Sequence, residues 1–83
     1  MGITVETTPN PRAMKFNVGT PVGGTATATA AEGADKRIAP LFEINGVMSV
    51  FMTADFVTIS ASEDASWETI VAQATEVLER SFG

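Results

Sequence analysis

The sequence has 83 residues, 45% of them hydrophobic, and this length leaves room for one small hydrophobic core. It contains no cysteine, histidine or tyrosine, which excludes thiolate and imidazole ligation of metals, thiol redox chemistry and cysteine nucleophiles. Ten acidic and five basic residues give a formal net charge of −5, so repulsion from a phosphate backbone predicts that nucleic acid is not a partner.

Location and domain organisation follow from the same features. No apolar run is long enough to span a membrane, and no membrane association is expected. The first nine residues lack a basic segment followed by an apolar one, so we expect no signal peptide and a cytoplasmic protein. No internal repeat is visible, and residues 1–83 are expected to form a single domain.

The N-terminal part predicts a β-hairpin. Residues 3–8 and 13–18 alternate apolar and polar side chains, as strands with one buried face do. Residues 9–12, with two prolines around an asparagine, form the loop between them. Pairing Val5 with Phe16 places the apolar groups of both strands on one face, which supports this register.

Residues 19–24 are rich in glycine and predict a flexible connection. Residues 25–30 alternate threonine and alanine with period two, which predicts a strand, plausibly at a sheet edge. A low-complexity loop is the alternative, because alanine is a weak strand former.

A first helix is expected to begin near Asp35, a suitable N-cap, and to carry apolar residues at i, i+3 and i+4 from Ile38. Gly46 is placed to end the helix in a left-handed conformation. Pro40 conflicts with a regular helix, because proline in a helix interior removes a backbone hydrogen bond, so a kink or a later start is expected.

Residues 47–52 and 55–61 predict a second hairpin, with a turn at residues 53–54. The expected register pairs Phe51 with Phe56 and places both rings on the less apolar face. The opposite face, which makes the better core, then consists of Met48, Val50, Met52, Val57 and Ile59.

The C-terminal part predicts the clearest helix, which begins after Asp64 or Ser66 as N-cap. Its apolar residues follow helical spacing: Trp67, Ile70, Val71, Ala74, Val77, Leu78 and Phe82. The predicted order is β-β-β-α-β-β-α. The expected fold is α+β, a largely antiparallel sheet with two helices packed on one face.

Three segments carry a resemblance to a known family. The first is residues 8–16, with Thr-Pro-Asn-Pro followed by Met-Lys-Phe, and the second is residues 41–47, with Leu-Phe-x-Ile-x-Gly-Val. The third is residues 50–51 with residues 55–59, followed by Trp67 at the start of the last helix. Together they resemble the N-terminal domain of Nfu-type iron–sulfur scaffold proteins. Family members often have glycine in the last hairpin turn, where this sequence has Thr53 and Ala54.

The resemblance implies a role in iron–sulfur cluster assembly. Scaffold members of the family carry a second domain with a Cys-x-x-Cys pair that assembles the cluster, and this sequence contains no such pair. The resemblance therefore implies only the accessory domain, either alone or cut from a longer protein, without a cofactor of its own. It supplies no catalytic residue.

The candidate partner-binding residues fall in two groups. Asn10, Arg12 and Lys15 place an amide and two cations in and beside the proline loop of an acidic protein; the alternative for Asn10 is that it caps its own turn. Phe51 and Phe56 form an aromatic pair on the sheet, a typical contact site; the alternative is that other parts of the chain cover them.

The function expected is a non-catalytic protein-interaction module, accessory to cluster assembly or delivery, whose partner is an iron–sulfur scaffold, carrier or apo-target. An enzyme is not expected, because acid–base chemistry would rest on carboxylates such as Glu43 and Asp55, whose separation nothing in the sequence sets. The alternative is a regulatory domain that binds a small molecule or ion in a pocket between the helices and the sheet. The oligomeric state is left open.

Overall fold

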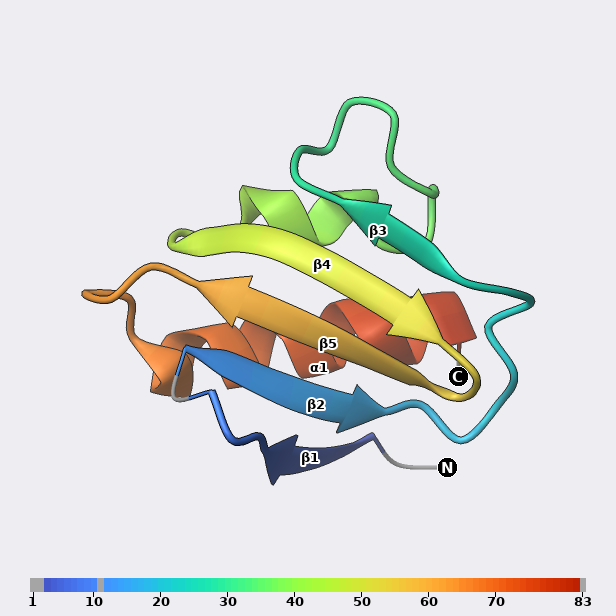
Figure 1. The fold of residues 1–83 in the computed structure, drawn as a ribbon, viewed down its shortest axis with the longest axis horizontal. Helices are drawn as coiled ribbons and strands as arrows, with labels where there is room; N and C mark the ends of the chain where they lie inside the picture. Colours follow the sequence, from blue (N-terminus) through green and yellow to red (C-terminus); the bar gives the residue numbers. More distant parts are fainter. Residues whose placement is uncertain (1–2, 11, 83) are drawn as a thin grey trace.

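The computed structural model describes residues 3–10 and 12–82, and its main element is a five-stranded sheet in the order β1-β2-β5-β4-β3 (Figure 1). All neighbouring strands are antiparallel. The strands are β1 (Thr4–Thr7), β2 (Ala13–Asn17), β3 (Ala26–Ala28), β4 (Val47–Thr53) and β5 (Phe56–Ala61). The α-helix α1 (Trp67–Phe82) packs behind the sheet in the view of Figure 1.

The predicted N-terminal hairpin is confirmed, because β1 pairs with β2 and Val5 lies opposite Phe16. The connection at residues 19–24 was expected to be flexible, but it is held against the β4–β5 turn. The amide of Val18 donates to the carbonyl of Asp55 at 3.0 Å, and that of Val22 donates to Ala54 at 2.8 Å. Val22 is buried, so this connection forms part of the core.

The threonine–alanine repeat forms a strand at the sheet edge, as predicted, but only over Ala26–Ala28. Both alanines are half-buried against the core, whereas Thr27 is exposed. Because alanine side chains bury little apolar area, the ladder with β4 extends over three residue pairs and then ends.

The prediction of a first α-helix is wrong, because this segment forms a five-residue 3₁₀-helix, η1 (Ala39–Glu43). Pro40 lies in its first turn, where the missing N–H costs no hydrogen bond, and the same residue prevents an α-helix from starting earlier. Asp35 caps the preceding turn instead, since its Oδ1 accepts from the amide of Arg37 at 2.9 Å. Gly46 has a φ of +98°, as its predicted left-handed role requires.

The second hairpin is present with a register shifted by two residues. Phe51 lies opposite Thr58 and Phe56 lies opposite Thr53, so the two rings are diagonal neighbours and the predicted direct pair is wrong. The two-residue turn falls on residues 54–55, and Ala54 has a φ of +52°. A shift of two preserves the side-chain alternation, so the predicted division of the strands into two faces still holds.

Met48 is the exception to the predicted core face. The β4–β5 register shifts between Val47 and Ser49, which marks a β-bulge, and Met48 within it is 59% exposed. The bulge interrupts the alternation that would have turned this side chain inward. Met52, at the other end of β4, is buried as predicted.

Helix α1 begins after Ser66, whose Oγ accepts from the amide of Thr69 at 3.4 Å. Its buried residues Ile70, Ala74 and Leu78 cover the inner face of the sheet. The architecture is thus α+β with one α-helix and an antiparallel sheet, and η1 replaces the second helix that was expected. Within the described residues, neither helix has the length and apolar character needed to cross a membrane.

Candidate functional site

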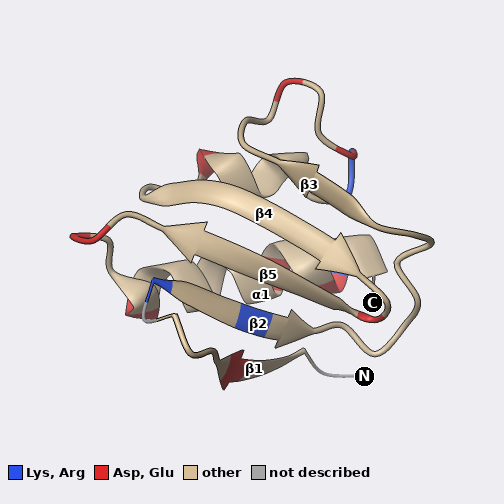
Figure 2. Ribbon diagram, viewed as in Figure 1, with Lys and Arg blue, Asp and Glu red and all other residues tan. Residues whose placement is uncertain are grey.

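One face of the sheet carries neither helix, and it faces the viewer in Figure 1. We call it the outer sheet face; strand alternation assigns to it Thr4, Glu6, Ala13, Lys15, Asn17, Thr27, Ser49, Phe51, Thr53, Phe56, Thr58 and Ser60. Strands β3, β4 and β5 contain no charged residue (Figure 2). The charges of this face therefore come from β1 and β2 alone.

Three of the five predicted partner-binding residues meet on this face. The ammonium of Lys15 on β2 lies 4.4 Å from the ring centroid of Phe56 on β5. Phe51 on β4 lies opposite Thr58, which in turn lies opposite Lys15. Both rings are half-buried, so each presents part of its surface to solvent. Among the described residues Lys15 has no carboxylate within ion-pair distance.

Polar side chains surround this cluster, and the sequence reasoning did not single them out. The Oγ1 atoms of Thr25 and Thr53 lie 2.8 Å apart. Asn17 donates through Nδ2 to the carboxylate of Glu6, which ties β2 to β1. Strand alternation alone would have found Asn17, because it shares the parity of Lys15 on β2.

Asn10 performs the structural role given as its alternative. Its Oδ1 accepts from the amide of Arg12 at 2.9 Å, and its carbonyl accepts from the amide of Ala13 at 3.0 Å. The hydroxyl of Thr8 lies 2.9 Å from the carbonyl oxygens of both Asn10 and Ala13. The loop is therefore held by its own hydrogen bonds before any partner arrives.

Arg12 forms an exposed ion pair with Glu63, with 3.0 Å between Nη2 and Oε2. Its carbonyl accepts from the amide of Ala61, so it lies at the far end of β5 from Phe56. Five residues along a strand separate these two positions, roughly 17 Å at about 3.4 Å per residue. The structure thus separates Asn10 and Arg12 from the cluster around Lys15.

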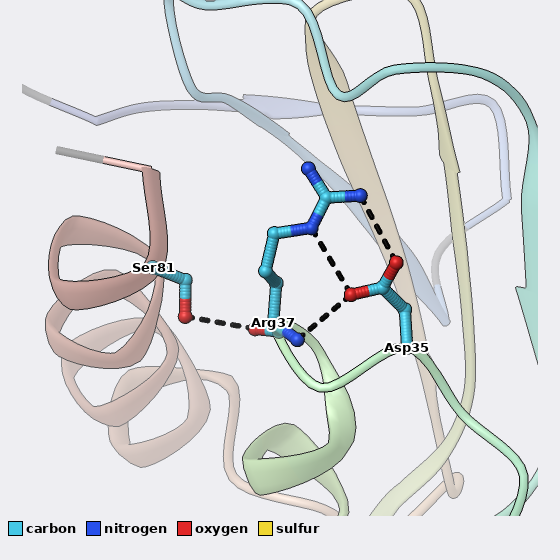
Figure 3. A network of polar contacts seen from close by, with 3 residues as sticks. All are labelled: Asp35, Arg37 and Ser81. Carbon is cyan, nitrogen blue, oxygen red and sulfur yellow. Dashed lines mark hydrogen bonds and ion pairs between the residues drawn. The ribbon is translucent and has the colours of Figure 1, made fainter.

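The segment before η1 is tied to the end of α1 (Figure 3). The guanidinium of Arg37 binds the carboxylate of Asp35 through two contacts of 3.0 Å, and the carbonyl of Arg37 accepts from the hydroxyl of Ser81 at 2.9 Å. The Arg37 hydrogen bonds lower the pKa of Asp35 to about 2. Arg37 also lies over the ring of Phe82, 5.1 Å from its centroid. This network fastens the C-terminal turn of the helix.

A pocket between the helices and the sheet would favour the alternative function, a domain that binds a small molecule or ion. The groove found, of about 290 Å³, lies between η1 and α1. Glu43 belongs to η1 and Asp55 to the turn between β4 and β5, so the seven residues of β4 separate these two carboxylates along the chain. Within the described part of the chain, no three Asp or Glu residues are grouped so that they could hold a metal ion.

Comparison with known proteins identifies relatives of the whole described fold. Residues 3–83 match the family model for the scaffold protein Nfu/NifU N-terminal domain. NifU-like protein 5, mitochondrial, of Arabidopsis thaliana is 36% identical over 82% of the chain. The NFU1 iron-sulfur cluster scaffold homolog, mitochondrial, of Drosophila erecta is 39% identical over 94% of it. The chain spans only 26% and 29% of the lengths of these two relatives.

Solved structures share the fold. The crystal structure of protein SAV1430 from Staphylococcus aureus has a TM-score of 0.82 and 28% identity, and the match covers 93% of this chain and 98% of that one. The solution structure of SeR13 from Staphylococcus epidermidis has a TM-score of 0.67 and 34% identity, with 98% of each chain covered.

Proposed function

Because this chain belongs to the Nfu/NifU N-terminal domain family of scaffold proteins, we propose that it is a non-catalytic protein-interaction module of iron–sulfur cluster assembly or delivery. Its relative from Drosophila erecta is named as an iron-sulfur cluster scaffold homolog, which supports this setting. These 83 residues contain neither cysteine nor histidine to ligate iron, so in this proposal they do not hold the cluster themselves. We propose that residues 1–83 act as one unit in this role.

The outer sheet face is the proposed docking surface, and the observation that carries it is the cluster of Lys15, Phe51 and Phe56. Aromatic side chains are enriched at protein interfaces, and Phe51 and Phe56 present two half-exposed rings, one of them beneath the ammonium of Lys15. Strands β3, β4 and β5 bring no competing charge to the face. A partner gains affinity here by covering the rings.

The partner chemistry follows from the charge of Lys15. Its ammonium forms no ion pair among the described residues, because Glu6, which lies directly opposite on β1, binds Asn17 instead; an acidic side chain of the partner would complete the charge of Lys15. We therefore propose an iron–sulfur scaffold, carrier or apo-target that presents an Asp or Glu next to an apolar patch. Asn10 and Arg12 lie at the end of the same sheet and make peripheral contacts, weaker because Arg12 already pairs with Glu63.

The test is direct binding to purified candidates. Scaffold, carrier and apo-target proteins of the same organism are each titrated against the immobilised chain. We expect at least one to bind, and Lys15→Glu to weaken that binding about tenfold or more, as loss of a central charge contact does. Lys36→Glu is the matched control, since Lys36 is exposed and lies outside the sheet. If Lys15→Glu and Lys36→Glu weaken binding equally, the outer sheet face is not the docking surface.

The location is also part of the proposal. A cytoplasmic protein was expected from the sequence, whereas the plant and fly relatives are named as mitochondrial. Fluorescent tagging of the native protein in its own cell decides between the two compartments.

A further inference from the structure

A second surface lies on the helix side of the sheet, away from the outer sheet face. It is the groove of about 290 Å³ between η1 and α1. Pockets that enclose small molecules measure roughly 300–1,000 Å³ and bury most of the ligand. A groove at the lower limit of that range fits one or two side chains of another protein better than an enclosed ligand.

One wall of the groove is a straight face of α1. It consists of Gln73, Glu76, Val77 and Arg80, which stand at positions i, i+3, i+4 and i+7. Residues at this spacing lie above one another on a helix, and seven residues rise by about 10 Å. The wall is therefore two helical turns long, a length suited to a second helix lying alongside.

The other wall comes from η1 and the residue after it. Pro40, Glu43 and Ile44 line this side. Ile44 is buried, 5% exposed, and with Val77 across the groove it supplies an apolar floor. An aliphatic side chain inserted between these two residues would lose its contact with water, which favours binding.

The charges of the groove are unbalanced. Arg80 forms an ion pair with Glu76 on the next turn of α1, so these two charges satisfy each other. Glu43 makes no hydrogen bond or ion pair to any residue that the structure describes. The groove thus has one carboxylate in excess, in a protein whose formal net charge is −5. A cation is the complementary group.

We propose that this groove binds a short amphipathic helical segment of another protein, which inserts an aliphatic side chain between Val77 and Ile44 and places a Lys or Arg beside Glu43. The inference does not depend on the outer sheet face, because the two surfaces share no residue. A domain with both surfaces can hold two protein segments at once.

The probes are two synthetic peptides of about 15 residues, long enough to form helix in part. Both carry the same leucine stripe, flanked by lysine in one and by glutamate in the other. In NMR titrations of the 83-residue chain, we expect the Leu/Lys peptide to shift the amides of Ile44, Gln73 and Val77. The Leu/Glu peptide should shift none of them, and the amides of Phe51 and Phe56 should stay unchanged with both peptides.

Two charge reversals complete the test. Glu43→Lys should weaken the Leu/Lys peptide about fivefold or more, and Glu43→Gln should weaken it less, in proportion to the smaller charge change. Glu79→Lys is the matched control, because Glu79 is exposed on α1 outside the groove, and should change the affinity less than about twofold. The amide spectrum of each variant checks that it is folded.

The inference is overturned if the Leu/Lys peptide shifts no groove amide at about 1 mM, a concentration that detects even weak binding. Equal effects of Glu43→Lys and Glu79→Lys would overturn it as well, since the attraction would then be non-specific. Shifts confined to the strands would assign the peptide to the outer sheet face instead. The Lys15 experiment uses other variants and a protein partner, so the two proposals can fail separately.

Discussion

The ammonium of Lys15 lies 4.4 Å from the centroid of the Phe56 ring, which joins β2 to β5 diagonally across the outer sheet face. Lys15 is directly opposite Thr58, and Phe56 is directly opposite Asn17. A cation over an aromatic ring at an exposed site is worth about 0.5–1 kcal/mol. The contact orders the lysine stem and the ring before a partner binds, which lowers the entropy lost on docking.

Lys15→Ala should lower the free energy of unfolding by about 0.5–1 kcal/mol, the value of this cation–ring contact. Urea denaturation followed by fluorescence of the single tryptophan measures the change. Lys36→Ala is the control, because Lys36 is exposed and has no ion pair or ring contact among the described residues. This substitution should change the free energy of unfolding by less than about 0.5 kcal/mol. Equal stability of the two variants would show that the contact is absent in solution.

Gly46→Ala should destabilise the protein by about 2–4 kcal/mol, because a positive φ and a steric clash act together. The φ of Gly46 is +98°, and a Cβ added there would lie 2.6 Å from the Cβ of Ala65. Thermal or urea unfolding measures the loss.

The control for that substitution is Gly33→Ala, which has a φ of +83° and no atom within 4 Å of the added Cβ. It should cost about 1 kcal/mol, the backbone strain alone. Ala65→Gly in the Gly46→Ala background removes the clash and should restore part of the stability. If Gly46→Ala lowers the free energy of unfolding no more than Gly33→Ala does, residue 46 does not lie close to Ala65 in solution.

Ala54→Gly should stabilise the protein by up to about 1 kcal/mol. Ala54 is the one non-glycine residue with a positive φ in the described chain, and glycine removes the steric cost of that conformation, although it adds freedom to the unfolded state. Ala30→Gly, at an exposed loop position, should be neutral or destabilising. A loss of stability in Ala54→Gly would mean that the turn is not strained.

Asp35→Asn should make the free energy of unfolding depend less on pH in the acid range. The pKa of Asp35 is lowered from 3.8 to about 2, so the folded state favours its charged form. A lowered pKa contributes stability that is complete above the unfolded value near 3.8 and is lost as the pH falls to about 2. Wild type should therefore lose more stability than Asp35→Asn between pH 4 and pH 2.

The size of that difference is modest. The side chains of Arg37 and Asp35 are 37% and 33% exposed, so solvent screens their attraction and the contribution is about 0.5–1 kcal/mol. Urea midpoints measured at pH 2, 3, 4 and 6 for both proteins provide the comparison. Parallel curves would show that Asp35 is not paired with Arg37 in solution.

Strand alternation predicted most of the sheet, because period-two patterns reflect which face is buried. It placed Phe16, Val50 and Val57 correctly on the inner face, even though the expected β4–β5 register was shifted by two residues. Alternation cannot distinguish registers that differ by two, and the turn that decides between them uses Ala54 with a positive φ, a residue that gives no turn signal.

The errors arose where local backbone chemistry overrides periodicity. Pro40 limits its segment to the 3₁₀-helix η1, although the apolar spacing from Ile38 favours an α-helix. The bulge turns Met48 outward, and no residue type marks a bulge in the sequence. The groove beside Val77 was missed for a different reason: it needs the packing of η1 on α1, which no local pattern contains.

The most direct test of the account measures the affinity of one purified partner, an iron–sulfur scaffold, carrier or apo-target protein. Its affinity for the wild-type chain is compared with its affinity for Phe51→Ser, Lys15→Glu and Lys36→Glu. The account predicts that the first two variants weaken binding about tenfold or more while Lys36→Glu binds like wild type, with all variants folded. Unchanged affinity of the folded Phe51→Ser and Lys15→Glu variants would contradict docking through the outer sheet face.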